Sequence, residues 1–148
     1  MKIINSLLSL ISFSIILLFE NFLNLIISNT YISIAPFYIL LFIFSLKRFN
    51  NRNIFPIMGS GILYDIFLSE NYLGVYAIIF LVTTVSINYI YEKVIDFNFK
   101  LLFIFAFNYL IYNIPNILNP NIFSIIALSV FINYLLFILL KRVMRFRV

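Results

Sequence analysis

GSGILYD at residues 59–65 and LGVYA at residues 73–77 are the two runs that decide the fold of this chain. They hold all three glycines of the chain and one carboxylate, Asp65, within apolar sequence. A carboxylate in such a run costs roughly 3 kcal/mol or more to place in lipid, so it needs a partner. Gly61 and Asp65 are four positions apart and therefore share one face of a helix. We expect Gly61 to let a neighbouring helix approach closely, so that this helix shelters Asp65.

The composition indicates that the solvent of this chain is lipid. Of its 148 residues, 64% are hydrophobic and 10% are charged, and the mean hydropathy is +1.12. A soluble domain is about half apolar and about a quarter charged, so this chain lacks the polar residues to cover a water-facing surface. The chain contains no Cys and no His. Disulfides, thiol nucleophiles, iron–sulfur sites, imidazole metal sites and Ser-His triads are thereby excluded.

The hydropathy pattern predicts an all-α integral membrane protein, a compact bundle of six transmembrane helices. The predicted spans are residues 3–27, 34–46, 54–68, 72–91, 101–114 and 121–140. Since a span needs about 20 residues, six spans use the whole length and form a single transmembrane domain over residues 1–148. The first span lacks the cleavage site of a signal peptide, so we expect it to be retained. Ser33 is placed as the N-cap of the second helix, with Pro36 in its first turn.

The third span is short, about 22 Å at 1.5 Å per residue. We expect it to lie inside the bundle or to leave its outer end below the membrane surface. The fourth helix starts a few residues after Asp65, and its first N–H groups are unpaired at the positive end of the helix dipole. We expect Asp65 to face those groups, with Gly74 removing a side chain that would block the approach.

Positive charges set the orientation. With six spans and the N-terminus inside, all ten Lys and Arg fall on one side, namely Lys2, Lys47, Arg48, Arg52, Lys93, Lys100, Lys141, Arg142, Arg145 and Arg147. The opposite loops carry none, so the positive-inside rule makes both termini cytoplasmic. The basic tail at 141–148 is interpreted as an anchor for anionic headgroups. No nucleic-acid partner is expected, because no basic groove with stacking aromatics is available outside the membrane.

Three roles stay open for Asp65: a structural clip between two helices, which we favour, a proton or ion site, and a contact with a partner protein. A lone carboxylate without an intramembrane Lys or Arg makes a poor acid–base pair, so we do not expect an enzyme. Glu20 is expected to reach the outer interface, with a partnered site inside the membrane as the alternative. Asn88, Asn108 and Asn133 can each bond weakly between helices, and none is singled out.

The two runs resemble the signature region of the MreD family of rod-shape-determining membrane proteins. The resemblance covers about residues 36 to 94, in the order Gly, Asp, polar turn, Leu-Gly. The turn at residues 69–72, SENY, is a residue longer than the glycine-bearing turn usual in the family. The candidate structural or interaction residues are Gly59, Gly61, Asp65, Leu73 and Gly74.

The resemblance implies a structural or interaction component of the bacterial cell-elongation machinery, in the cytoplasmic (inner) membrane. It implies association with an MreC-like scaffold protein, and through it a link from the MreB filament to enzymes of peptidoglycan synthesis. No catalytic residue, cofactor or metal is expected. The alternative is the substrate-binding subunit of a small-solute (vitamin) transporter, which has a similar size and six helices. That function would need a polar pocket at the outer side, which Glu20, Asp65 and Glu70 can line.

Overall fold

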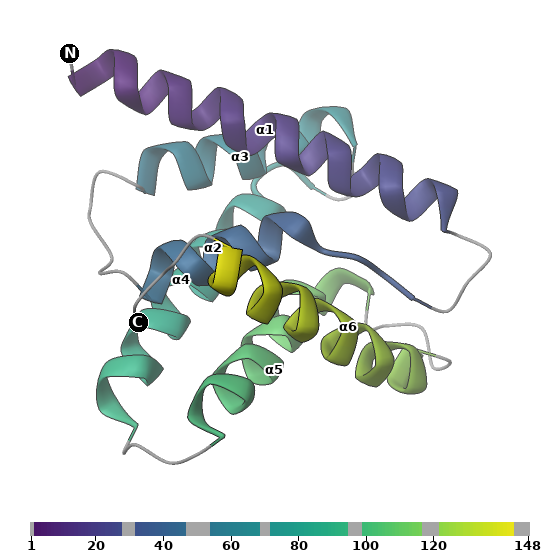
Figure 1. Cartoon of the computed structure of the whole chain (residues 1–148). Coiled ribbons are helices and arrows are strands. Elements are labelled where there is room, and N and C mark those ends of the chain that lie inside the picture. The colour runs from purple at the N-terminus through teal and green to yellow at the C-terminus, as the bar shows by residue number, and fades with distance from the viewer. Residues whose placement is uncertain are drawn as a thin grey trace.

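The computed structural model describes residues 2–27, 32–46, 54–68, 72–94, 99–116 and 122–143. These residues form six α-helices and one short 3-10 turn, so the predicted all-α class is confirmed for them (Figure 1). The elements are α1 (Lys2–Ile26), α2 (Pro36–Leu46), α3 (Ile54–Phe67), α4 (Val75–Lys93), α5 (Lys100–Tyr112), η2 (Ile114–Asn116) and α6 (Ile122–Val143). Consecutive helices run in opposite directions, and each begins and ends close to its predicted bounds (Figure 1).

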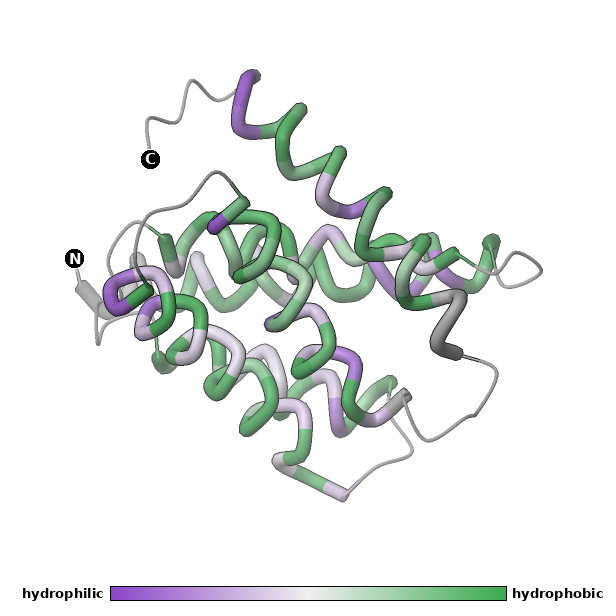
Figure 2. The backbone as a smooth tube through the Cα atoms, turned by 90° about the horizontal axis from the view of Figure 1, so that it is seen from below, coloured by the Kyte–Doolittle hydropathy of each residue, from purple (hydrophilic) through white to green (hydrophobic). Residues whose placement is uncertain are grey.

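Among the described residues, two helices are long and apolar enough to cross a membrane: Ser6–Ile26 within α1 and Val75–Lys93, which is α4. Helices α2, α3 and α5 are also apolar, but they have 11, 14 and 13 residues. Figure 2 shows hydrophobic residues along the helices and a hydrophilic last turn on α6, where Lys141 and Arg142 lie. Much of the apolar surface of α1 is exposed, as at Phe22 and Leu25. An apolar exposed face of this extent suits lipid better than water.

The interior of the bundle is occupied by α2. Phe37, Tyr38, Leu41 and Phe42 are fully buried there, and α1, α4, α5 and α6 pack around them. One of the two positions predicted for the third helix is the interior of the bundle; in the structure α2 lies there instead. Helix α3 lies at the periphery and exposes Phe55 and other apolar side chains.

Aromatic rings fill the space between α2, α5 and α6. The ring of Phe105 lies 4.9 Å from Tyr38 and 5.0 Å from Phe42, centroid to centroid, in edge-to-face contacts. Phe42 meets Phe137 of α6 in the same way at 5.1 Å. Such contacts contribute about 0.5–1.5 kcal/mol each beyond the burial of area. The hydroxyl of Tyr38 donates a 2.6 Å hydrogen bond to the carbonyl of Phe105, so its polar atom is satisfied inside this core.

The residues before α2 are extended, and the prediction of Ser33 as its N-cap is wrong. The helix begins at Pro36, and residues 32–35 carry no regular secondary structure. A residue that precedes proline is pushed out of the helical region, which keeps Ala35 extended. Ser33 is held from outside instead: its N–H donates to Ser129 Oγ at 2.9 Å, and its hydroxyl lies 2.8 Å from the hydroxyl of Tyr109.

Several predicted features lie outside the described residues. These are the basic loop at 47–53, the polar turn with Glu70 at 69–71 and the basic tail from residue 144 onward.

Candidate functional site

Asp65 bonds the backbone at the start of α4. Its Oδ2 accepts hydrogen bonds from the N–H of Gly74 at 2.8 Å and from the N–H of Tyr76 at 3.2 Å. The carboxylate is buried, with 5% of its surface exposed. Because α4 begins at Val75, the carboxyl group of Asp65 lies at the positive end of the helix dipole and accepts from N–H groups that have no partner within the helix. The predicted contact between Asp65 and the fourth helix is therefore present.

Gly61 brings α3 and α4 into backbone contact. A Cβ atom added at Gly61 would lie 2.5 Å from both the Cα and the N of Ala77, and 2.8 Å from the carbonyl carbon of Tyr76. These atoms belong to the backbone of α4, so no side-chain rotation relieves the clash. The close approach predicted for Gly61 is confirmed. Together with the Asp65 hydrogen bonds it forms what we call the α3–α4 joint.

Gly74 has a different role from the one predicted. A Cβ atom at this position would meet nothing within 4 Å, so Gly74 does not provide space for Asp65. Its φ is +95°, a left-handed conformation that glycine adopts without steric cost. This conformation turns the chain into α4 and lets Gly74 donate its own N–H to Asp65. The prediction that Gly74 clears the approach is wrong, since the requirement is one of backbone conformation.

Two of the five candidate residues lie outside the α3–α4 joint. Gly59 faces α1, where an added Cβ would come within 2.6 Å of the flexible end of Leu10. Leu73 is 70% exposed. The structure thus brings together Gly61, Asp65 and Gly74, whereas Gly59 serves a different helix contact and Leu73 lies at the surface.

Glu20 does not reach outward, which corrects the expectation of an interfacial carboxylate. Only 9% of its surface is exposed. Its Oε2 accepts a hydrogen bond from the N–H of Phe37 at 2.8 Å, and its Oε1 accepts one from the hydroxyl of Tyr112 at 2.7 Å. Phe37 lies in the first turn of α2 and Tyr112 in the last turn of α5. The alternative of a partnered carboxylate inside the bundle is the one the structure bears out, because inward donors were available to Glu20.

Two asparagines hold the extended segment 32–35. Asn24 of α1 accepts the N–H of Ile34 at 3.0 Å and donates to the carbonyl of the same residue at 3.1 Å. Asn133 of α6 accepts the N–H of Ala35 at 2.8 Å and donates to the carbonyl of Ser33 at 2.8 Å. In a regular helix these N–H and carbonyl groups would bond to one another. Here the side chains of Asn24 and Asn133 bond them instead.

Sequence reasoning did not single out Asn133, and residue type alone gave no signal to do so. Asn108 is equally buried, but its Nδ2 donates to Ile104 of its own helix at 2.8 Å and its Oδ1 has no partner among the described residues. Asn88 donates to the carbonyl of Ser45 at 3.3 Å, a weaker contact between α4 and α2. The partners of Asn133 are about a hundred residues away in sequence, so no local spacing reveals them.

A polar cavity of about 80 Å³ lies where these contacts meet. Its lining includes Glu20, Asn21, Tyr64, Tyr76, Tyr112 and Asn113, together with Asn24 and part of the extended segment. Asp65 is not part of the lining. The pocket predicted for a carrier is thus present only in part, with one of its three expected carboxylates at the wall and Glu70 outside the described residues.

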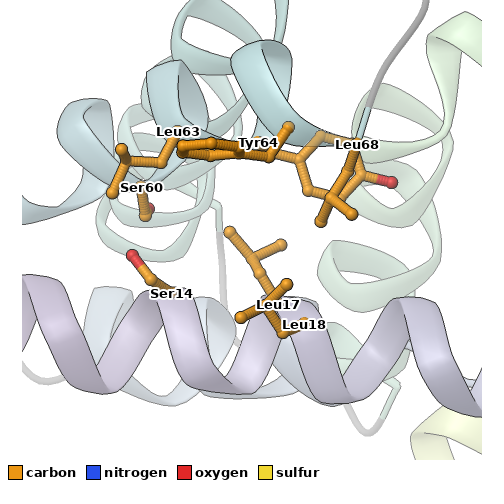
Figure 3. Close-up of a pocket in the computed structure, with 8 residues that line it drawn as sticks. Ser14, Leu17, Leu18, Ser60, Leu63, Tyr64 and Leu68 are labelled. Atoms are coloured by element: carbon orange, nitrogen blue, oxygen red, sulfur yellow. The ribbon is translucent and has the colours of Figure 1, made fainter.

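An apolar groove of about 340 Å³ lies between α1 and α3. Figure 3 shows Ser14, Leu17 and Leu18 of α1 facing Ser60, Leu63 and Tyr64 of α3 across it. Leu18 is 53% exposed, so the groove borders the apolar outer face of α1. The hydroxyl groups of Ser14 and Ser60 already donate hydrogen bonds to carbonyls of their own helices, so they are not available as donors in the groove.

Comparisons with protein-family models, with curated proteins and with solved structures found no match to this chain.

Proposed function

We propose that this chain is a six-span protein of the bacterial cytoplasmic (inner) membrane that acts as a structural or interaction component of the cell-elongation machinery. In this proposal it holds an MreC-like scaffold protein in the membrane, and through that scaffold it maintains rod shape. Enzymes of peptidoglycan synthesis and the MreB filament are indirect partners. The proposal rests on the resemblance of residues 59–77 to MreD and on how the structure uses those residues.

The observation that carries this proposal is the α3–α4 joint. Gly61, Asp65 and Gly74 are three of the residues on which the resemblance depends, and each has a positional role: a backbone contact, a hydrogen-bond acceptor and a left-handed turn. Asp65 accepts hydrogen bonds from two backbone N–H groups, those of Gly74 and Tyr76. Because all three residues have structural roles, we interpret the joint as part of a rigid scaffold and not as a reactive site.

Six spans are compatible with the short helices. Helix α2 has a length of about 16 Å at 1.5 Å per residue, and the four extended residues before it add about 13 Å at 3.3 Å each. Together they approach the ~30 Å hydrocarbon thickness of a bilayer. Non-helical backbone is tolerated at that depth only where protein or a polar cavity surrounds it. Here protein surrounds it: the side chains of Asn24, Asn133 and Ser129 accept hydrogen bonds from the N–H groups of residues 33–35.

The groove between α1 and α3 is the surface we assign to the partner's transmembrane helix. It is apolar, it opens on an exposed face of α1, and small serine side chains at its wall permit close helix approach. A membrane partner with a single span can bury apolar side chains there without any loop outside the membrane.

The vitamin-carrier alternative has weaker support. Pockets for drug-sized or cofactor-sized molecules have about 300–1,000 Å³. The polar cavity at Glu20 has about 80 Å³. The larger groove is mainly apolar, and among the described residues that line it no charged side chain is available to recognise a polar vitamin.

Cysteine cross-linking tests the assigned surface directly, because the chain has no Cys of its own. Leu18→Cys should cross-link in membranes to single cysteines placed along the transmembrane helix of the MreC-like scaffold, with a helical periodicity. The matched control is Leu128→Cys on α6, which is similarly exposed but does not line the groove. Equal cross-linking of both variants, or none from Leu18→Cys, contradicts the assignment.

Depletion in a rod-shaped host tests the role in the cell. We expect cells to become round while wall synthesis continues. Rod-shaped cells that fail to take up a vitamin would instead support the carrier function.

A further inference from the structure

The polar cavity at Glu20 lies beside the α1–α3 groove and the α3–α4 joint, sharing Tyr64 with the groove and Tyr76 with the joint, but neither feature involves Glu20. It lies where the last turns of α1 and α5 meet the extended segment and the start of α4. A site of about 80 Å³ with polar walls is large enough for several waters or for one small polar group. Extended backbone at its edge is the arrangement that lines ligand sites within membrane bundles.

Glu20 is the one acidic side chain among the described residues that line this cavity. Both of its oxygens accept hydrogen bonds, from the N–H of Phe37 and from the hydroxyl of Tyr112. Those donors are neutral, and among the described residues no Lys or Arg lines the cavity. A nearby positive charge offsets part of the cost of keeping a buried carboxylate ionised. The cavity therefore favours a positively charged occupant.

The remaining walls indicate which cation fits. Tyr64, Tyr76 and Tyr112 contribute aromatic rings, and the rings of Tyr64 and Tyr76 lie 4.5 Å apart, centroid to centroid. Aromatic rings around a carboxylate suit an organic ammonium, which interacts with ring faces and donates hydrogen bonds. A divalent metal is a poorer match, since Ca²⁺ and Mg²⁺ sites draw on several oxygen ligands, most often including more than one carboxylate. The described residues contain no cluster of three or more acidic side chains.

We propose that this cavity binds a primary ammonium group, with Glu20 as the counter-ion, the three tyrosine rings as walls and amide oxygens of Asn21 and Asn113 as further acceptors. Two sources supply this chemistry: the headgroup of phosphatidylethanolamine, inserted from the bilayer, and a free small amine. Both place an –NH₃⁺ group in the cavity and leave the rest of the molecule outside it.

The test uses the full chain in nanodiscs of phosphatidylglycerol, which contain no amine. At constant ionic strength, methylammonium chloride should raise the unfolding temperature in a saturable manner, while sodium and tetramethylammonium chloride should not. In nanodiscs that contain phosphatidylethanolamine, a lipid source predicts an already raised unfolding temperature and no further response to methylammonium. A free-amine source predicts that the response to methylammonium persists in both lipids.

Glu20→Gln is the decisive variant. Its amide keeps an acceptor for the N–H of Phe37 and a donor for the hydroxyl of Tyr112, so the fold loses little, but the charge is gone. Apparent affinity for methylammonium should fall by about tenfold or more, as expected for the loss of a charged hydrogen-bond partner. Asp65→Asn is the control, because Asp65 does not line the cavity and contacts its wall through the N–H of Tyr76, so its affinity for methylammonium should fall far less than that of Glu20→Gln.

Three results would overturn the proposal: no response of the wild type to methylammonium in either lipid, an equal response to sodium, or an unchanged response in Glu20→Gln. The first two concern the wild-type protein alone, so the proposal can be refuted even where Glu20→Gln does not fold.

Discussion

The carboxylate of Asp65 accepts a 2.8 Å hydrogen bond from the N–H of Gly74, nine residues further along the chain. Gly74 occupies the N-cap position of α4 and has no side chain with which to cap that helix. Asp65 thus supplies from α3 what an N-cap side chain would supply locally. Glu20 does the same for α2 through the N–H of Phe37. Two helix starts in this bundle are therefore capped by carboxylates of other helices.

Substitutions at Asp65 separate its hydrogen bonding from its charge. Asp65→Asn keeps an acceptor oxygen for the N–H groups of Gly74 and Tyr76, so we expect it to fold and to retain the proposed function in cell shape. Asp65→Leu leaves those N–H groups without that acceptor and should lower the free energy of unfolding by about 1–3 kcal/mol. Complementation of a deletion strain, together with membrane abundance, measures both effects. An abundant, stable but inactive Asp65→Asn protein would contradict a purely structural role and point to the charge.

Alanine at each of the three glycines should give three different results. Gly61→Ala should be the most destabilising, because the new Cβ meets the backbone of Ala77 at 2.5 Å and α3 must move. Gly74→Ala should cost roughly 1–2 kcal/mol through its left-handed backbone. Gly59→Ala should be mild, since the end of the Leu10 side chain can rotate away. Unfolding by denaturant in detergent gives the order.

Gly74→Asn extends that comparison, because Asn tolerates the left-handed conformation better than Ala. It should be more stable than Gly74→Ala. A Gly74→Asn variant as unstable as Gly74→Ala would argue that something other than φ requires glycine there.

Leucine substitutions at two buried asparagines provide a matched pair. Asn133→Leu leaves the N–H of Ala35 and the carbonyl of Ser33 without their partner, so it should lower stability by about 1–2 kcal/mol. Asn108→Leu removes only a bond within its own helix and also removes an unpaired Oδ1, so it should be neutral or stabilising. Thermal unfolding in the same detergent compares them. The reverse order would refute the role assigned to Asn133.

Topology is tested by reporter fusions. Six spans with both termini in the cytoplasm predict a cytoplasmic reporter after Arg52 and an external one after Asn71. The prediction follows from placing all ten Lys and Arg on one side. Fusions at both positions that report the same side, or the opposite pattern, would exclude this arrangement.

Sequence reasoning succeeded where a feature is local. Apolar runs marked each helix to within a few residues, and the four-residue spacing of Gly61 and Asp65 marked the close contact with α4. It failed where a partner is remote. The donors to Glu20 come from α2 and α5, 17 and 92 residues away, and no pattern around Glu20 reveals them. Gly74 shows a third case: the residue was identified, but its φ depends on a turn that sequence does not specify.

The side-chain bonds to residues 32–35 also constrain the order in which the protein is assembled during synthesis. Ser33 and Ala35 leave the ribosome long before Tyr109, Ser129 and Asn133, which bond them in the finished protein. Until those residues arrive, this stretch of backbone lacks the side chains that pair its polar groups. In the proposed six-span arrangement we therefore expect the second helix to reach its final depth only after the last two helices are inserted, and a ribosome stalled before residue 129 should leave the protein open to proteolysis at this segment.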